Sequence, residues 1–177
     1  TLDICLTSLM QQTMDNFEAI VVDGGSKDRT VDIAEHYGFN VLEVEKKRPH
    51  DVSSAKNEVV KYCNGDYVFF LDADMYVAPN CIEVLNKEFN DDNVIGVALK
   101  VLPREGTNLE SFMYEVNNRL ALVGNFIKFY QLSYFSCHCY DRDAFLKVGG
   151  FREDLLACED LDLSLRISDL GEYRVTH

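Results

Sequence analysis

The sequence is short of positive charge. It has 17 lysine and arginine residues against 30 aspartate and glutamate residues, which gives a formal net charge of −13 at pH 7. A surface with that balance repels nucleic acid and anionic lipid, so the composition argues against a protein that binds polyanions. If the ligand is nonetheless a phosphate compound, a metal ion must neutralise much of its charge.

Two further absences narrow the class of protein. No apolar run approaches the roughly 18 residues of a membrane-spanning helix, and we expect no signal peptide. The six cysteines lack any C-x-x-C spacing, which favours reduced, mostly buried thiols in a cytosolic protein. Cys137-His138-Cys139 could ligate a soft metal, but it has no second pair of ligands nearby and we interpret it as structural. We therefore expect a cytoplasmic location, with a peripheral position at the cytosolic face of a membrane as an alternative.

The length and the hydrophobic pattern predict a single α/β domain. At 177 residues, with 47% hydrophobic and 27% charged residues, the chain is long enough to bury one core. Patterns typical of strands occur at 17–22, 40–45, 67–71 and 94–102, and they alternate with helical patterns at 2–10, 28–36, 53–63 and 79–89. This alternation predicts a mainly parallel sheet with right-handed crossovers.

The pattern changes after Pro103. Apolar residues at helical spacing predict a long helix near 109–123, which either belongs to the core or faces a lipid-linked acceptor. A strand at 132–140, a short helix from Arg142 and a helix at 159–170 follow. The sequence starts on a helical pattern, whereas a doubly wound domain normally opens on a strand. We therefore expect that a first strand and a C-terminal tail are missing.

Two acidic residues, Asp72 and Asp74, directly follow the apolar run at 67–71. A short continuous apolar run predicts a strand buried on both faces of a parallel sheet, and ligands bind at the carboxyl ends of such strands. Two carboxylates one residue apart repel each other unless a cation lies between them. Mg²⁺ is typically held by one or two carboxylates together with substrate phosphates. By itself the pattern leaves two interpretations open, a divalent metal site and a solvated turn.

Several motifs, in a fixed order, resemble those of family 2 glycosyltransferases. They are Gln11-Gln12-Thr13, Asp23-Gly24-Gly25-Ser26 within 17–30, Ser54-Ala55-Lys56-Asn57, Asp72-Ala73-Asp74 within 65–74, Gly149-Gly150-Phe151-Arg152-Glu153, and Glu159-Asp160 within 159–166. The resemblance covers nearly the whole chain. It implies a GT-A fold, with a Rossmann-like, mainly parallel sheet flanked by helices. It also implies one catalytic domain over 1–177, in which 1–103 bind the nucleotide-sugar and 104–177 bind the acceptor.

The same resemblance implies an activity. Members of the family transfer a sugar from a nucleotide-diphosphate donor to an acceptor hydroxyl with inversion, using Mn²⁺ or Mg²⁺. It places the metal ion on Asp72 and Asp74, and the catalytic base on Asp160 with Glu159 as its partner. These roles make chemical sense, because a divalent ion stabilises the leaving phosphate and a weakly nucleophilic hydroxyl needs a base. The donor could be a UDP-, GDP- or dTDP-sugar, and the acceptor a saccharide or a lipid-linked compound.

Further residues are predicted to bind the donor, namely Asp23, Gly25, Ser26, Lys56, Asp72 and Arg166. Asp23 either accepts a hydrogen bond from the nucleobase or ribose, or only initiates a turn. Lys56 stands where the family commonly has arginine, so it keeps the charge near the phosphates but loses the bidentate fork. Arg166 either reaches a phosphate, braces the acid pair, or neutralises Asp162 at i+4. We leave the terminal His177 out of the site.

Three other functions share part of this pattern. A haloacid-dehalogenase-type phosphatase also carries two spaced aspartates after a strand, but near its chain start and without the Met75-Tyr76 that follow here. A sugar nucleotidyltransferase usually has a glycine-rich, basic triphosphate loop, for which Gly24-Gly25-Ser26-Lys27 is a thin substitute. A non-catalytic module that binds nucleotide-sugars is the third alternative, and the presence of Asp160 beside the two aspartates argues against it.

Overall fold

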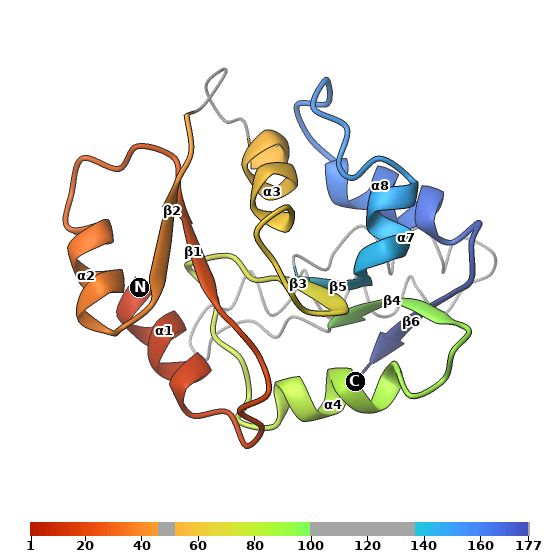
Figure 1. The fold of residues 1–177 in the computed structure, drawn as a ribbon, viewed down its shortest axis with the longest axis horizontal. Coiled ribbons are helices and arrows are strands. Elements are labelled where there is room, and N and C mark those ends of the chain that lie inside the picture. Colours follow the sequence, from red (N-terminus) through yellow and green to blue (C-terminus); the bar gives the residue numbers. More distant parts are fainter. Residues whose placement is uncertain (46–51, 100–136, 177) are drawn as a thin grey trace, which may run out of the picture.

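A computed structural model describes residues 1–45, 52–99 and 137–176 of the chain (Figure 1). The helices are α1 (Leu2–Met10), α2 (Thr30–His36), α3 (Val52–Val60), α4 (Cys81–Glu88), α7 (Arg142–Lys147) and α8 (Glu159–Ile167). The strands are β1 (Ile20–Asp23), β2 (Asn40–Glu43), β3 (Tyr67–Phe70), β4 (Val94–Leu99), β5 (Cys137–Asp141) and β6 (Glu172–Thr176). Every predicted element within these ranges is present, and β6 is an additional strand that the sequence analysis missed. The helix predicted near 109–123 lies outside the described residues.

The described strands form two hydrogen-bonded sheets. β1 and β2 make a parallel pair, while the second sheet has the order β3-β5-β4-β6. β4 and β6 are parallel, but β5 is antiparallel to both β3 and β4. The expected α/β class is therefore confirmed, with parallel and antiparallel pairs in the larger sheet.

The expectation of a parallel environment for the strand before Asp72 was wrong for its described partner. β3 pairs antiparallel with β5, and Tyr67 at its start is 40% exposed. A short apolar run has the same pattern in a parallel strand and in a covered antiparallel one, so its sequence could not reveal the direction of its neighbour. That neighbour comes from the part of the chain after Pro103, where the alternating pattern had already ended.

Helices cover both faces of the four-stranded sheet. Figure 1 shows α3, α7 and α8 on one side of it and α4 on the other. Side chains of β5 alternate between the two resulting cores, because successive residues of a strand point to opposite faces. Tyr140 packs in the cluster with Phe145 and Leu163 of α7 and α8, whereas Cys139 packs in the cluster with Leu85 of α4. The sheet thus holds α3 and α8 on the same face.

The state of the cysteines and the length of the described helices were both predicted from the sequence. All six cysteines are free thiols, as predicted, and only Cys158 is exposed. Within the ranges described above, no helix is both long and apolar enough to cross a membrane.

Candidate active site

The predicted metal residues lie in the turn that follows β3. The backbone N–H of Met75 donates to the carbonyl of Asp72 at 3.0 Å, which closes the turn around Asp74. Burial raises the pKa of the Asp72 carboxyl, Lys56 opposes this rise, and the carboxylates of Asp160, Asp74 and Glu159 add to it. Charges affect the pKa of Asp72 in this way only when they lie close to its carboxyl group. Residues that the sequence placed 16 to 104 positions from Lys56 therefore share one electrostatic environment.

Lys56 of α3 lies against the predicted catalytic pair. Its Nζ is 3.3 Å from Oδ1 of Asp160 and 3.9 Å from Oε1 of Glu159. The ammonium group also lies over aromatic rings, 5.1 Å from the ring centre of Phe151 and 5.9 Å from that of Phe70. The Lys56 side chain is only 14% exposed, so its contacts with the acids act in a partly desolvated setting.

The acid pair itself begins α8. Glu159 and Asp160, with Asp162, put three carboxylates in the first turn of the helix, where the positive end of the helix dipole favours negative charge. Cys158 precedes them with a φ of 61°, a left-handed conformation that a non-glycine residue rarely adopts. The chain thus turns sharply just before the residues that face Lys56.

Asn57, next to Lys56, belongs to the motif at 54–57, and the sequence predicts no role for it. Its Oδ1 accepts a hydrogen bond from the N–H of Phe151 at 2.8 Å, and its Nδ2 donates to the carbonyl of Phe151 at 2.9 Å. Gly150 has a φ of 68°, and a Cβ there would lie 2.5 Å from Oδ1 of Asn57. Only glycine allows the backbone at 150 to lie this close to Asn57. Through the two hydrogen bonds of Asn57, α3 holds the segment that leads to α8.

Arg166 of α8 also contacts the segment at 148–150. Its guanidinium donates to Asp162 at 2.8 Å, to the carbonyl of Val148 at 2.9 Å and to the carbonyl of Gly150 at 2.7 Å. These contacts support the alternative in which Arg166 neutralises Asp162 at i+4. Its role in donor binding stays a prediction.

Asp23 ends β1 and organises the glycine turn. The residue is 4% exposed, and its Oδ2 accepts hydrogen bonds from the N–H groups of Gly25 at 2.9 Å and Ser26 at 3.0 Å. Gly25 has a φ of 86°, which suits glycine. These hydrogen bonds support the turn-forming alternative. Contact of Asp23 with a nucleobase or ribose stays a prediction, as does donor binding by Gly25 and Ser26.

The chemistry of the acidic turn suits a hard divalent cation shared with a ligand. Across the described parts of the chain, no group of three or more histidine, cysteine, aspartate or glutamate residues could hold a metal ion unaided. Asp72 and Asp74 supply two carboxylates at one turn. Mg²⁺ usually needs only one or two carboxylates when phosphate and water oxygens complete its shell. The two acids therefore fit a metal that binds together with a diphosphate.

A buried polar network lies beneath α8, and the sequence analysis missed it. The hydroxyl of Tyr173 is 2.6 Å from Nδ1 of His138, and it accepts a hydrogen bond from Ser164 at 3.3 Å. The hydroxyls of Ser164 and Tyr140 are 3.2 Å apart. Ser164 follows Asp160 by four residues on one face of α8, so this network fixes the rotation of the helix that carries the predicted base. Helical spacing from Asp160 was the one signal in the sequence that could have pointed to Ser164.

Gly96 makes room for this network. A Cβ on Gly96 would collide with the ring of Tyr173, which lies across it from β6. The strand that was not predicted therefore supplies the central hydroxyl of the network.

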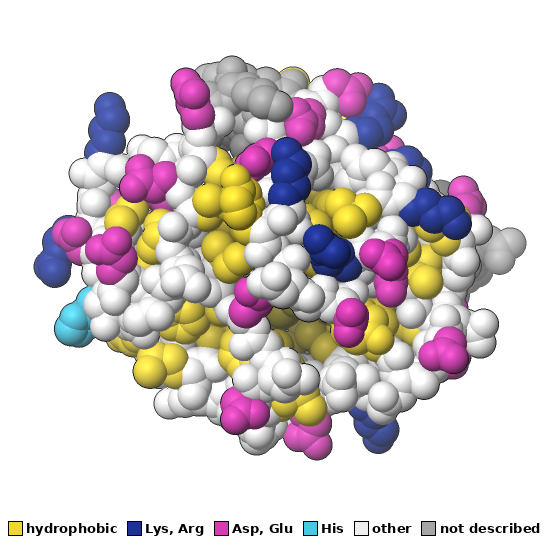
Figure 2. All heavy atoms as spheres, viewed as in Figure 1, with side chains coloured by type: hydrophobic (Ala, Val, Ile, Leu, Met, Phe, Trp, Pro, Cys, Tyr) yellow, Lys and Arg dark blue, Asp and Glu magenta, His cyan; other side chains and the backbone are white. Residues whose placement is uncertain are grey.

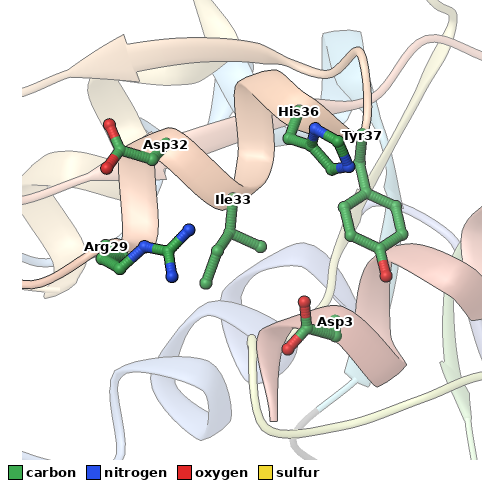
Figure 3. Close-up of a pocket in the computed structure, with 6 residues that line it drawn as sticks. All are labelled: Asp3, Arg29, Asp32, Ile33, His36 and Tyr37. Atoms are coloured by element: carbon green, nitrogen blue, oxygen red, sulfur yellow. The ribbon is translucent and has the colours of Figure 1, made fainter.

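A hollow lies away from the predicted site residues. An open cavity of about 550 Å³ lies between α1 and α2 and is lined by Asp3, Arg29, Asp32, Ile33, His36 and Tyr37. Figure 3 shows Arg29, Ile33 and Tyr37 facing Asp3 across it. None of the predicted site residues lines this cavity. Acidic and basic side chains are interspersed over the face seen in Figure 2.

Comparison with known proteins defines the class of fold. The mannosyltransferase PcManGT of Pyrobaculum calidifontis, solved with GDP-Man and Mn²⁺, matches 97% of this chain and 49% of its own, with a TM-score of 0.72 and 19% identity. TarS 1-349 of S. aureus, solved with UDP-GlcNAc, matches 99% of this chain and 52% of its own, with a TM-score of 0.73 and 20% identity. The fold is that of the GT-A nucleotide-sugar transferases.

Sequence comparison then identifies the family. The family model described as glycosyl transferase family 2 matches residues 1–149, and the chain belongs to that family. A chondroitin synthase of Escherichia coli is 25% identical over 96% of this chain. The chain spans only 25% of the length of that enzyme. The predicted family and fold are thus confirmed.

Proposed function

We propose that this domain performs metal-dependent, inverting transfer of a sugar from a nucleoside-diphosphate sugar to an acceptor hydroxyl. The observation that carries the proposal is the convergence of Lys56, Asp72 and the Glu159-Asp160 pair. Such a site combines carboxylates for a cation, a positive charge for phosphate and a candidate base. The Mn²⁺ and GDP-Man of the similar mannosyltransferase support a divalent ion and a nucleotide-sugar donor here.

The proposed reaction is a single displacement. The acceptor oxygen forms a bond to the anomeric carbon as the bond from that carbon to the phosphate oxygen breaks, and the hydroxyl proton passes to Asp160. A divalent ion bound with the diphosphate would stabilise the negative charge of the leaving group. Asp72 and Asp74 would hold that ion. Lys56 would add a second positive charge near the diphosphate, and Glu159 would act as the partner of the base Asp160.

The donor class is a sugar linked to a nucleoside diphosphate. Solved structures similar to this chain hold GDP-Man, UDP and UDP-GlcNAc, so purine and pyrimidine nucleotides both suit the fold. Asp23, Gly25 and Ser26 are the proposed contacts of the nucleoside. Thermal shift with a panel of UDP-, GDP- and dTDP-sugars and Mn²⁺ would identify the nucleotide, because a ligand that binds the native state raises its stability.

The deciding experiment separates binding from catalysis in the full-length protein. Asp160→Asn should lower the rate of transfer by about 10²- to 10⁴-fold, the usual contribution of a general base. Its affinity for the nucleotide should stay within about twofold of that of the wild type, since the base faces the acceptor. Asp169→Asn, an exposed change just beyond α8, is the matched control and should leave both unchanged. Normal transfer by Asp160→Asn would refute the assignment of the base.

The metal roles need a separate measurement. We expect the wild-type chain to bind its nucleoside diphosphate more tightly with Mn²⁺ than without it, and Asp72→Asn or Asp74→Asn to remove most of that gain. Equal affinity of the wild type in both conditions would contradict the assignment of Asp72 and Asp74 as metal ligands.

A further inference from the structure

Helix α1 contacts the segment that carries the two aspartates at several points along its length. Residues 71–80, which connect β3 to α4, belong to no helix or strand (Figure 1). We name this segment the acidic loop. Three side chains of α1 or its C-terminal end contact the loop and the start of α4, namely those of Cys5, Ser8 and Gln12. Cys5 and Ser8 are three residues apart and lie on one face of the helix, and Gln12 follows its C-terminal end.

The contacts follow the loop in order. The thiol of Cys5 lies 3.9 Å from the carbonyl of Asp72, at the start of the loop. In the middle, the N–H of Val77 donates to the hydroxyl of Ser8 at 3.2 Å. That hydroxyl donates its own proton to the carbonyl of Cys5 at 2.7 Å, so its lone pairs are turned toward Val77.

Gln12 binds the far end of the loop with both ends of its amide. Its Nε2 donates to the carbonyls of Ala78 at 2.8 Å and Ser8 at 2.9 Å. Its Oε1 accepts from the N–H of Ile82, in the first turn of α4, at 3.0 Å. One amide thus ties α1, the acidic loop and α4 together, and the N–H of Thr13 adds a hydrogen bond to the carbonyl of Pro79 at 2.7 Å.

We propose that Gln12 and Ser8 are positioning residues for the divalent ion, which act by holding the acidic loop so that Asp72 and Asp74 keep the spacing that the ion requires. This inference rests on the proposed function, in which those two aspartates are metal ligands. Carboxylate groups bind a small divalent ion well only when their geometry is fixed beforehand. A segment outside helices and strands lacks a regular backbone ladder to provide that order, and α1 supplies hydrogen bonds in its place.

The test measures how strongly Mn²⁺ and a nucleoside diphosphate help each other to bind. Isothermal titration gives the dissociation constant of UDP, GDP or dTDP, whichever the wild-type chain binds, without Mn²⁺ and at a fixed Mn²⁺ concentration that does not saturate the variants. Gln12→Met removes the amide but keeps a side chain of similar length. We expect the enhancement by Mn²⁺ to fall by about 10- to 100-fold, as for other residues that orient metal ligands. The metal-free affinity should stay within about twofold of that of the wild type.

Gln11→Met is the matched control, because it makes the same change at the exposed neighbouring residue. It should bind as the wild type does. Ser8→Ala removes one hydrogen bond to the loop and should cause a smaller fall than Gln12→Met, and it serves as the second variant if Gln12→Met does not fold. Saturating Mn²⁺ should restore the nucleotide affinity of either variant, which a general loss of structure would not allow.

Two results would overturn the inference. One is an unchanged enhancement by Mn²⁺ in folded Gln12→Met and Ser8→Ala. The other is an equal loss of affinity with and without the metal, which would show that α1 supports the nucleotide site in general. Failure of the proposed function looks different, since the wild-type chain would then show no enhancement by Mn²⁺ at all.

Discussion

The ammonium group of Lys56 lies 3.3 Å from the carboxylate of Asp160, across 104 residues of sequence. It also lies 3.9 Å from Glu159, and it opposes the rise that burial causes in the pKa of Asp72. One lysine therefore compensates the charge of acids from two different segments, the turn after β3 and the start of α8. This pairing has consequences for stability that can be measured without any substrate.

Lys56→Met should destabilise the folded chain at neutral pH. The change leaves Glu159, Asp160 and Asp72 without their shared cation in a partly buried setting, and we expect a loss of about 1–3 kcal/mol in the free energy of unfolding. Lys56→Arg keeps the charge and should lose less. Urea denaturation measures both. A Lys56→Met chain as stable as the wild type would show that the pairing contributes nothing to the fold.

Asp72→Asn should stabilise the metal-free chain at neutral pH. Burial raises the folded-state pKa of Asp72 above its ordinary value of 3.8, so the folded chain binds this proton more tightly than the unfolded chain does. The contribution of Asp72 to stability therefore falls as the pH rises from the unfolded pKa through the folded one. An asparagine side chain does not titrate, so the variant lacks this pH-dependent loss of stability.

Thermal unfolding of wild type and Asp72→Asn in the presence of a chelator tests the sign of the effect. The measurements run from about pH 3 to about pH 7, a range that includes the ordinary pKa values of carboxyl groups. The difference between the two proteins should grow in favour of the variant as the pH rises. A variant that is less stable than the wild type at neutral pH would mean that ionised Asp72 stabilises the fold.

Tyr173→Phe should destabilise the chain, because it removes the hydroxyl at the centre of the network under α8. Nδ1 of His138 and the hydroxyl of Ser164 would lose a partner in the core, at a cost of about 1–3 kcal/mol. Tyr62→Phe removes the same atom from a side chain that is 55% exposed, and it should change the free energy of unfolding by less than about 0.5 kcal/mol. Equal effects of the two changes would refute the structural role of the network.

The thiols should differ sharply in reactivity. Burial raises the pKa of Cys81 to about 11 and that of Cys137 to about 12, so these thiols stay protonated at neutral pH. Cys158 is exposed. We expect iodoacetamide to modify Cys158 first in the native protein, and Cys81 and Cys137 only after denaturation. Peptide mass spectrometry measures the order, and fast native labelling of Cys137 would contradict its burial.

Much of the fold follows from local patterns in the sequence. Hydrophobic periodicity predicts the helices and strands up to residue 99, since a buried face imposes its period on the residues that form it. The elements end one to three residues inside several predicted limits, for example at Val60 where 63 was expected. Turn chemistry likewise points to Asp23, whose carboxylate caps the glycine turn at 25.

Other features depend on residues that are distant in the sequence. The antiparallel insertion of β5 between β3 and β4 is invisible in any one strand, because a strand buried on both faces has the same pattern whichever way its neighbours run. β6 was missed although its five residues, Glu172 to Thr176, alternate between polar and apolar side chains. Its place was decided by packing against β4, where Gly96 leaves space for Tyr173.

The candidate site divides in the same way. The order of the motifs, through the resemblance to family 2 glycosyltransferases, predicts which acids form the site, whereas Asp72 and Asp74 by themselves left a solvated turn open. That Lys56 meets Asp160, that Arg166 holds the carbonyl of Gly150, and that Gln12 holds the acidic loop are results of tertiary structure. Side-chain pairs across long sequence separations depend on how the helices pack against the sheet, and no local pattern encodes that packing.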